Sequence, residues 1–176
     1  MVSHERGKVS SVMYQVGDNV VYGIHGVCTV TELEEKNIDR KKVQYYVLMP
    51  VEQPDARYFI PTGNPAAVSK LSPLLTRQEI ETLLCDRSVP ENTWINDENQ
   101  SKQRYRELIS SSDRTALLAM VRVLRAHKTE QLSQGRKFHL CDENFLKDAQ
   151  KLLSSEFSVV LNLSAAEVAD YVEKYL

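Results

Sequence analysis

The spacing of apolar residues changes once along the chain, near residue 75. Before that point, short runs rich in Val, Ile, Tyr and Thr alternate with glycine and proline turns, as in VGDNVVYG, GVCTVTELEEK, VQYYVLMPV and ARYFIP. Such runs, bounded by turn residues, are typical of β-strands. Because four or five short strands in about sixty residues cannot bury a face as an open sheet, the pattern predicts a small, closed SH3-like or Tudor-like β-barrel.

Beyond this point the apolar residues recur at helical spacing. Thr76 and Glu79 form a capping-box pattern in front of RQEIETLLCDR, and Ser164 and Glu167 form a second one in front of the last apolar stripe. Between these two signals we expect three further helices, over residues 99–109, 113–132 and 143–161. The second half of the chain is therefore predicted to be all-helical.

These two patterns predict an α+β protein with two domains, a small SH3/Tudor-like β-barrel followed by an all-α helical bundle. We place the barrel at residues 14–75 and the bundle at residues 76–176. Residues 1–13 are polar and lack any period, so we expect a flexible N-terminal extension there. A chain of 176 residues with 42% hydrophobic residues can build two modest cores of this kind.

The cysteines and the hydropathy of the chain indicate its cellular compartment. The three cysteines are odd in number and far apart, and the N-terminus lacks the apolar stretch that a signal peptide requires. No segment approaches the roughly 20 apolar residues of a membrane span. We therefore expect a cytoplasmic protein with reduced thiols and no membrane partner.

Residues 25–28, HGVC, raise the question of a metal or catalytic site. His25 and Cys28, together with His139 and Cys141, would supply the ligand types of a structural zinc site, but the two pairs belong to different predicted domains. Cys28 also falls in an alternating strand, where it serves as a small apolar filler. No base, oxyanion site or phosphate loop accompanies it. We therefore expect no metal site, no cofactor and no enzymatic activity.

Basic residues gather in the middle of the helical half, although the net charge of the chain is only -2. Residues 102–137 hold nine Lys or Arg and three acids. Arg122, Arg125 and Lys128 stand at i, i+3 and i+6, which places them on one side of a helix. This pattern fits a surface that contacts phosphates, and it also fits a solvated helix face with intrahelical ion pairs.

Both halves of the chain resemble one family. YQVGDNVVYGIHGVCTVTELEEK, YYVLMPV and YFIPTGNPAAVSKL together resemble the N-terminal RNA-polymerase-interacting domain shared by the CarD-like (CdnL) bacterial transcription regulators and the transcription-repair coupling factor. QRYRELISSSD and DENFLKDAQKLLSSEF are similar to the C-terminal domain of CarD proteins. The coupling factor has a helicase after this domain, for which the chain is too short, so the resemblance favours the CarD branch.

The resemblance implies that the barrel docks on the lobe of the polymerase β subunit, partly by adding a partner strand to its exposed edge. Lys36 matches a basic family position at this contact, and residues 57–59 lie on a strand where the family places further contacts. One branch of the family carries arginine where this chain has Phe59, so the contact here is expected to be more apolar or shifted along the strand. The implied polymerase-binding residues are Lys36, Arg57, Tyr58 and Phe59.

By the same resemblance, the helical domain lies over promoter DNA at the upstream edge of the transcription bubble and stabilises the open complex without reading a sequence. A tryptophan wedges at the minor groove, and nearby bases hold phosphates. Trp94 stands eleven residues before Tyr105, farther than in many relatives, and it fits an interdomain packing role as well as the wedge. The implied DNA-binding residues are Trp94, Lys102, Arg104, Arg106, Arg122, Arg125 and Lys128.

We accordingly expect a monomeric, non-enzymatic transcription regulator whose partners are the RNA polymerase β subunit and promoter DNA. The alternative is a protein-interaction module whose barrel binds some other partner and whose helical domain serves for dimerisation.

Overall fold

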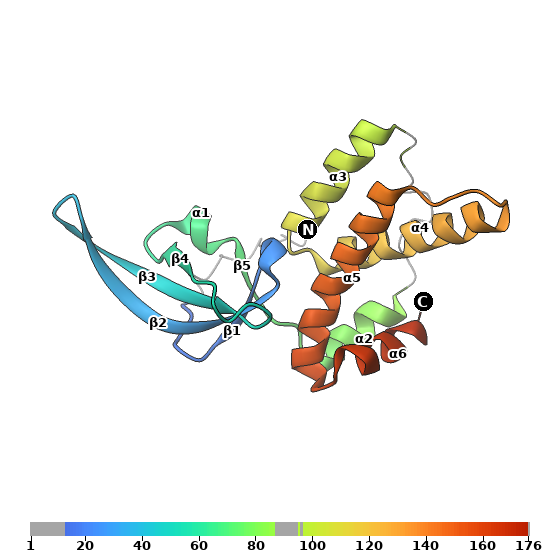
Figure 1. Ribbon diagram of the computed structural model, residues 1–176. Coiled ribbons are helices and arrows are strands. Elements are labelled where there is room, and N and C mark those ends of the chain that lie inside the picture. Colours follow the sequence, from blue (N-terminus) through green and yellow to red (C-terminus); the bar gives the residue numbers. More distant parts are fainter. Residues whose placement is uncertain (1–12, 87–94, 96, 176) are drawn as a thin grey trace, which may run out of the picture.

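The computed structural model describes residues 13–86, 95 and 97–175, and it shows a five-stranded sheet followed by helices (Figure 1). The strands are β1 (Asn19–Tyr22), β2 (Val27–Ile38), β3 (Lys41–Pro50), β4 (Tyr58–Pro61) and β5 (Leu71–Pro73). They pair antiparallel in the order β4-β3-β2-β1-β5. The predicted α+β class is therefore confirmed, whereas the predicted extension lies outside the described residues except for Met13.

The long hairpin of β2 and β3 projects away from the helices (Figure 1). Asp39 and Arg40 at its tip have φ angles of 48° and 65°. Positive φ at both central residues is the type I′ geometry, whose twist matches that of the flanking strands. The register of β2 against β3 shifts between Val30 and Glu32, which marks a β-bulge. The first part of β2 is buried, while the part beyond the bulge is largely exposed to solvent.

A small core lies on one face of the sheet. Its buried members are Tyr14, Val20, Cys28, Val30, Tyr46, Leu48, Ile60 and Leu71. The two short helical segments, η1 (Gly23–His25) and α1 (Pro65–Val68), follow β1 and β4. β4 and β5 are the edges of the sheet, and no ladder joins them among the described residues. The expected closure into a barrel is thus not shown by the strand pairing, although β4 and β5 both contribute to this core.

The helices of the second half are α2 (Arg77–Cys85), α3 (Glu98–Ser110), α4 (Arg114–Ser133), α5 (Leu140–Leu161) and α6 (Ala165–Glu173). Both predicted capping boxes are confirmed, Thr76 with Glu79 at α2 and Ser164 with Glu167 at α6. The side chains of Asp97 and Asp113 cap α3 and α4. These caps accept from backbone N–H groups that have no partner inside the helix, and they thereby fix where each helix begins.

α5 is the central helix of the bundle, because it contacts each of the other four helices. Its Phe157 and the facing Leu124 of α4 are fully buried in a second, larger hydrophobic cluster. α5 begins at Leu140 rather than at the expected residue 143, with two acidic residues in its first turn, where negative charge stabilises a helix N-terminus. Within the described residues no single helix is long and apolar enough to cross a membrane; α5 and α6 reach that length and composition only together, across a bend of 102°.

The sheet and the bundle touch at α5 and at the connection between α3 and α4. The amide of Leu75 donates to Glu156 Oε1 at 2.8 Å, and Lys151 Nζ lies 2.9 Å from Glu52 Oε2. Gly23 in η1 donates its N–H to Ser112 Oγ at 3.1 Å. The two halves are therefore joined by side-chain contacts as well as by the chain between β5 and α2.

Candidate functional site

The face of the sheet opposite the small core carries a cation over an aromatic ring. Lys36 pairs with Val43, and Phe59 pairs with Val47 across β3. Residues two apart on a strand share a face, so Lys36, Tyr45, Val47 and Phe59 lie on the same side of the sheet. Lys36 Nζ lies 3.8 Å from the centroid of the Phe59 ring and 5.8 Å from that of Tyr45. We call these four residues the outer patch.

The outer patch combines exposed apolar area with a positive charge. Phe59 is 43% exposed, whereas Val47 beneath it is only 4% exposed. The Lys36 ammonium also lies 3.6 Å from Glu34 Oε1, and both of these side chains are partly exposed. An ammonium held over an aromatic face loses little mobility when a partner carboxylate approaches, and the ring offers apolar area beside it. The outer patch is therefore suited to a protein partner with apolar and acidic groups.

The other two candidates for polymerase binding, Arg57 and Tyr58, point elsewhere. Tyr58 faces the core side of β4, where its ring lies 4.1 Å from that of His25 and 5.7 Å from that of Tyr22. Arg57 Nη1 donates to the carbonyl oxygens of Pro54 and Ala56 at 2.5 and 2.9 Å. The structure thus brings Lys36 and Phe59 together and separates Tyr58 from them. A role of any of these residues in binding stays a prediction.

The three cations expected on α4 are all bonded within the protein. Arg122 donates to the backbone carbonyls of Asp86 and Leu84, at 2.6 and 2.9 Å. Arg125 makes a bidentate pair with Glu173, at 2.8 and 2.7 Å, and Lys128 Nζ lies 2.8 Å from Glu143 Oε2. These bonds hold α2, α5 and α6 against α4. A phosphate that contacted these cations would have to compete with bonds already made.

Two of the three cations of α3, Arg104 and Arg106, are exposed to solvent. Lys102 pairs with Glu98 one turn earlier, and Arg104 lies 3.9 Å from Glu107. Arg106 is exposed and has no ion pair with any acidic side chain in the described part of the chain. Arg136 and Lys137, between α4 and α5, are likewise exposed and unpaired within the described residues. The helical half therefore keeps accessible positive charge on α3 and in the α4–α5 connection.

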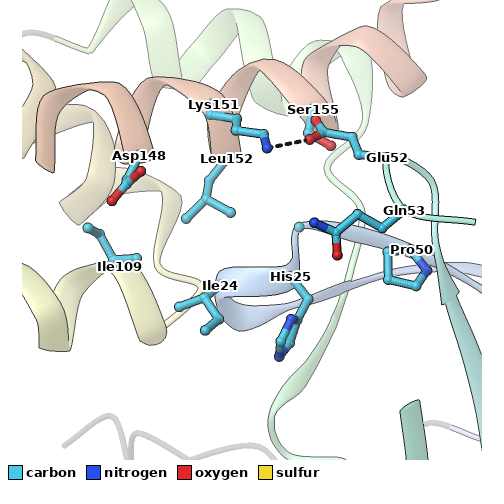
Figure 2. A pocket seen from close by; sticks show the side chains of 11 residues that line it. Ile24, His25, Pro50, Glu52, Gln53, Ile109, Asp148, Lys151, Leu152 and Ser155 are labelled. Carbon is cyan, nitrogen blue, oxygen red and sulfur yellow. Dashed lines mark ion pairs between the residues drawn. The ribbon is translucent and has the colours of Figure 1, made fainter. Parts of the chain in front are cut away.

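A cleft of about 320 Å³ lies where the sheet meets the bundle, with α5 above it and η1 below it in Figure 2. Lys151 crosses the cleft to Glu52, and this bond raises the pKa of the lysine. Ile24 lines one wall, while Ile109 and Leu152 line the other. Because the cleft has walls from both halves, its shape depends on how they are oriented.

Comparison with known proteins shows which family the sheet resembles. The family model of the CarD-like/TRCF RID domain matches residues 14–72, which contain β1 to β4 and the first two residues of β5. We refer to residues 14–72 below as the RID domain, after the family model that they match. The chain is also similar to "Putative transcription factor YdeB" of Bacillus subtilis (strain 168), with 25% identity over 168 residues, which cover 90% of this chain and 99% of the relative. The sequence resemblance is therefore confirmed for the RID domain, and a likeness to one protein extends over most of the helical half.

HGVC belongs to the framework of the RID domain. Cys28 is fully buried, its thiol lies 3.8 Å from the Gly26 carbonyl oxygen, and burial raises the pKa of the thiol to about 11. His25 stacks on Tyr58, and burial lowers the pKa of its imidazole. No group of three or more His, Cys, Asp or Glu is placed to hold a metal ion in the described part of the chain. The thiol is therefore protonated at neutral pH and acts as apolar filling between strands.

Gly26 of this segment is needed for its backbone conformation. Its φ and ψ are 66° and -144°, in a region that residues with a Cβ rarely adopt. A Cβ built there would lie 3.5 Å from Ser155 Oγ and 3.8 Å from a Leu152 methyl carbon, at ordinary van der Waals distance. The conformation turns the chain from η1 into β2 directly beside α5.

Sequence reasoning missed part of the outer patch and the bonds at the junction. Tyr45 and Val47 join Lys36 and Phe59 only through the register of β2, β3 and β4, which no local pattern contains. In the sequence Arg114 is one of the nine basic residues between positions 102 and 137, and no local pattern indicates that it pairs with Glu156 at 2.9 Å. A glutamate inside the apolar run LLSSEFSVVL was a signal, because a charge in such a stretch is buried only with a partner. Trp94 lies outside the described residues, and its role stays a prediction.

Proposed function

We propose that this protein is a bacterial transcription regulator that binds the lobe of the RNA polymerase β subunit through its RID domain. The match of residues 14–72 to the RID domain family carries this proposal, since that domain takes its name from interaction with RNA polymerase. The outer patch supports it, because an exposed phenyl ring next to a lysine can serve as an anchor in a protein interface. Among the described residues the sheet ends at β4 and β5 with no ladder between them, and such an edge strand can take up a partner strand.

We further propose that the helical half contacts promoter DNA without sequence preference, at the backbone and the minor groove near the upstream edge of the bubble. Arg106, Arg136 and Lys137 support phosphate contacts, because they are exposed and unpaired within the described residues. Trp94 is the candidate wedge. Tethering to polymerase raises the local concentration of a weak DNA binder, so a few phosphate contacts are sufficient. The result is a longer-lived open complex.

A related proposal covers the remaining properties of the protein. It acts as a monomer without enzymatic activity or cofactor, in the cytoplasm and at the nucleoid through its association with polymerase. Full burial and a raised pKa argue against Cys28 as a nucleophile. These properties distinguish a regulator that acts by binding from one that acts by turnover.

The test is the lifetime of a promoter open complex formed by the polymerase of the same organism. Wild-type protein is expected to lengthen this lifetime, Phe59→Ala to abolish the effect at a given concentration, and Arg106→Gln with Lys137→Gln to reduce it. Arg125→Gln is the matched control, since Arg125 is occupied by Glu173. No effect of the wild-type protein on the lifetime would refute the proposed DNA function.

The second candidate is an interaction module with another partner, in which the helical half serves for dimerisation. The bonds of Arg122, Arg125 and Lys128 to groups of the protein itself favour it, because they reduce the charge available for DNA. Sedimentation equilibrium of the full chain separates the two candidates. A dimer that forms at micromolar concentration and has no effect on the open complex would support this second candidate.

A further inference from the structure

The junction between the sheet and the helical bundle contains a buried ion pair. The Arg114 and Glu156 side chains are 13% and 3% exposed. Arg114 Nε donates to Glu156 Oε2 at 2.9 Å, and its Nη2 donates to Glu156 Oε1 at 3.0 Å. Arg114 is the first residue of α4, and Glu156 lies in α5, so this pair by itself joins two helices of the bundle.

Both members of the pair also bond to the chain at the end of β5 and just after it. Arg114 Nη2 donates to the Pro73 carbonyl at 2.7 Å, at the last residue of β5. Glu156 Oε1 accepts the N–H of Leu75 at 2.8 Å, two residues farther along the chain. The segment between sheet and bundle is therefore bonded to both members of the ion pair, to the guanidinium through a carbonyl oxygen and to the carboxylate through an N–H group.

A second attachment starts from the same guanidinium. Arg114 Nη1 donates to the carbonyl oxygen of Ser112 at 3.0 Å, and Ser112 Oγ accepts the N–H of Gly23 at 3.1 Å. Ser112 is buried and has a φ of 57°, an uncommon conformation for a non-glycine residue that the surrounding bonds maintain. The network thus reaches η1, which follows the Tyr22 end of β1, whereas Pro73 pairs with Val20, nearer the other end of that strand.

An ion pair of this kind contributes more to geometry than to stability. Removing two charges from water costs nearly as much as their attraction returns, so buried pairs are weak stabilisers compared with apolar residues of equal volume. Their directional bonds nevertheless favour one arrangement over others. At this junction the arrangement concerned is the orientation of the helical bundle relative to the sheet.

We propose that Arg114 and Glu156 are positioning residues that hold the bundle in one orientation relative to the RID domain, so that docking on polymerase delivers the bundle to one place on promoter DNA. The second half of this statement rests on the proposed function. A rigid junction preserves the gain in local concentration from tethering, whereas a loose one spreads the bundle over positions that do not reach the DNA.

The orientation can be measured without polymerase. Spin labels at Lys42 in the hairpin and Gln134 at the end of α4 report the distance between the two halves, in a chain whose exposed Cys85 and partly buried Cys141 are changed to serine. The test variant is Arg114→Met with Glu156→Leu, which keeps the junction filled with apolar side chains and leaves no buried charge unpaired. We expect a single narrow distance distribution in the starting chain and a clearly broader one in this variant.

Two further variants act as matched controls. Lys151→Gln breaks the exposed ion pair to Glu52 across the same junction, and Glu173→Gln breaks an ion pair inside the bundle. Both are expected to keep the narrow distribution, because exposed pairs contribute little. Should the double variant remain folded by circular dichroism and also keep the narrow distribution, the positioning role would be refuted.

The functional half is tested by two binding readouts. In the double variant, affinity for the isolated β lobe should stay within about two-fold of wild type, while the open-complex lifetime falls by about ten-fold or more. An unchanged lifetime with a broadened distance distribution would overturn the link between orientation and DNA. If the wild-type protein itself does not lengthen the lifetime, the proposed function fails, and the distance measurement still decides whether Arg114 and Glu156 position the bundle.

Discussion

Replacing Gly26 by alanine tests how the RID domain is built at its contact with α5. The φ of 66° and ψ of -144° at this position are nearly confined to glycine. The added methyl carbon would meet Ser155 and Leu152 at 3.5 to 3.8 Å, which is ordinary contact, so overlap with neighbours adds little. The expected loss is therefore backbone strain alone, about 1–3 kcal/mol in the free energy of unfolding. With a urea m-value of about 2 kcal/mol per M, the midpoint falls by roughly 0.5–1.5 M.

Gly63→Ala is the matched control for this measurement. Gly63 has no positive φ, and a Cβ there would meet nothing within 4 Å. Alanine at such a site leaves stability unchanged or raises it by about 0.4–1 kcal/mol, because it reduces the freedom of the unfolded chain. Urea unfolding of wild type and both variants, followed by circular dichroism, compares the two positions. Equal midpoints for Gly26→Ala and Gly63→Ala would refute the argument that the conformation at Gly26 requires glycine.

Three further predictions concern single side chains. The exposed Cys85 should react with a thiol reagent such as DTNB within seconds to minutes. Cys28 should react only when the sheet unfolds, since it is fully buried and its pKa is raised to about 11. Equal reaction rates of the two thiols in the native protein would contradict this prediction. Burial lowers the pKa of His25 below 6.5, so the contribution of its neutral form to stability is present above that pH and is lost as the pH falls. Between about pH 7.5 and 5.5, His25→Gln should therefore lose less stability than wild type, as measured by urea unfolding at each pH. Thr76→Ala removes the side-chain cap of α2 and should lower the free energy of unfolding by about 0.5–2 kcal/mol, whereas no change would mean that the capping box is not needed.

Local signals in the sequence predicted the elements well, because they depend on neighbours in the chain. The capping boxes at Thr76 and Ser164 lie where the pattern put them, and Cys28 is buried in an alternating strand as expected. Helix starts at Asp97 and Asp113 follow from the same chemistry of side chains that accept backbone N–H groups. The type of each main element could therefore be predicted without knowledge of the fold.

Pairings between distant residues could not be predicted in this way. Arg125 and Glu173 are 48 residues apart, and only the packing of α6 against α5 and α4 brings them together. The spacing of Arg122, Arg125 and Lys128 showed correctly that they share a helix, but not that Glu173, Glu143 and two backbone carbonyls would bind them. The same limit explains why Phe59 and Tyr58, adjacent in sequence, lie on opposite faces of β4 and have different neighbours.

Binding of the polymerase β lobe by the outer patch of the RID domain can be measured directly. The most direct test is binding of the full chain to an isolated β-lobe fragment from the same organism, with wild type, Lys36→Glu and Phe59→Ala. Lys42→Glu is the control, because Lys42 is exposed on the same hairpin but lies one register position away, on the other face.

We expect micromolar binding by wild type and by Lys42→Glu, and a loss of affinity of about ten-fold or more in Lys36→Glu and Phe59→Ala. Absence of binding by wild type at roughly 50 µM, which corresponds to less than about 6 kcal/mol, would contradict the proposed binding. Equal affinities for all four proteins would show that the fragment binds another surface and would contradict it as well.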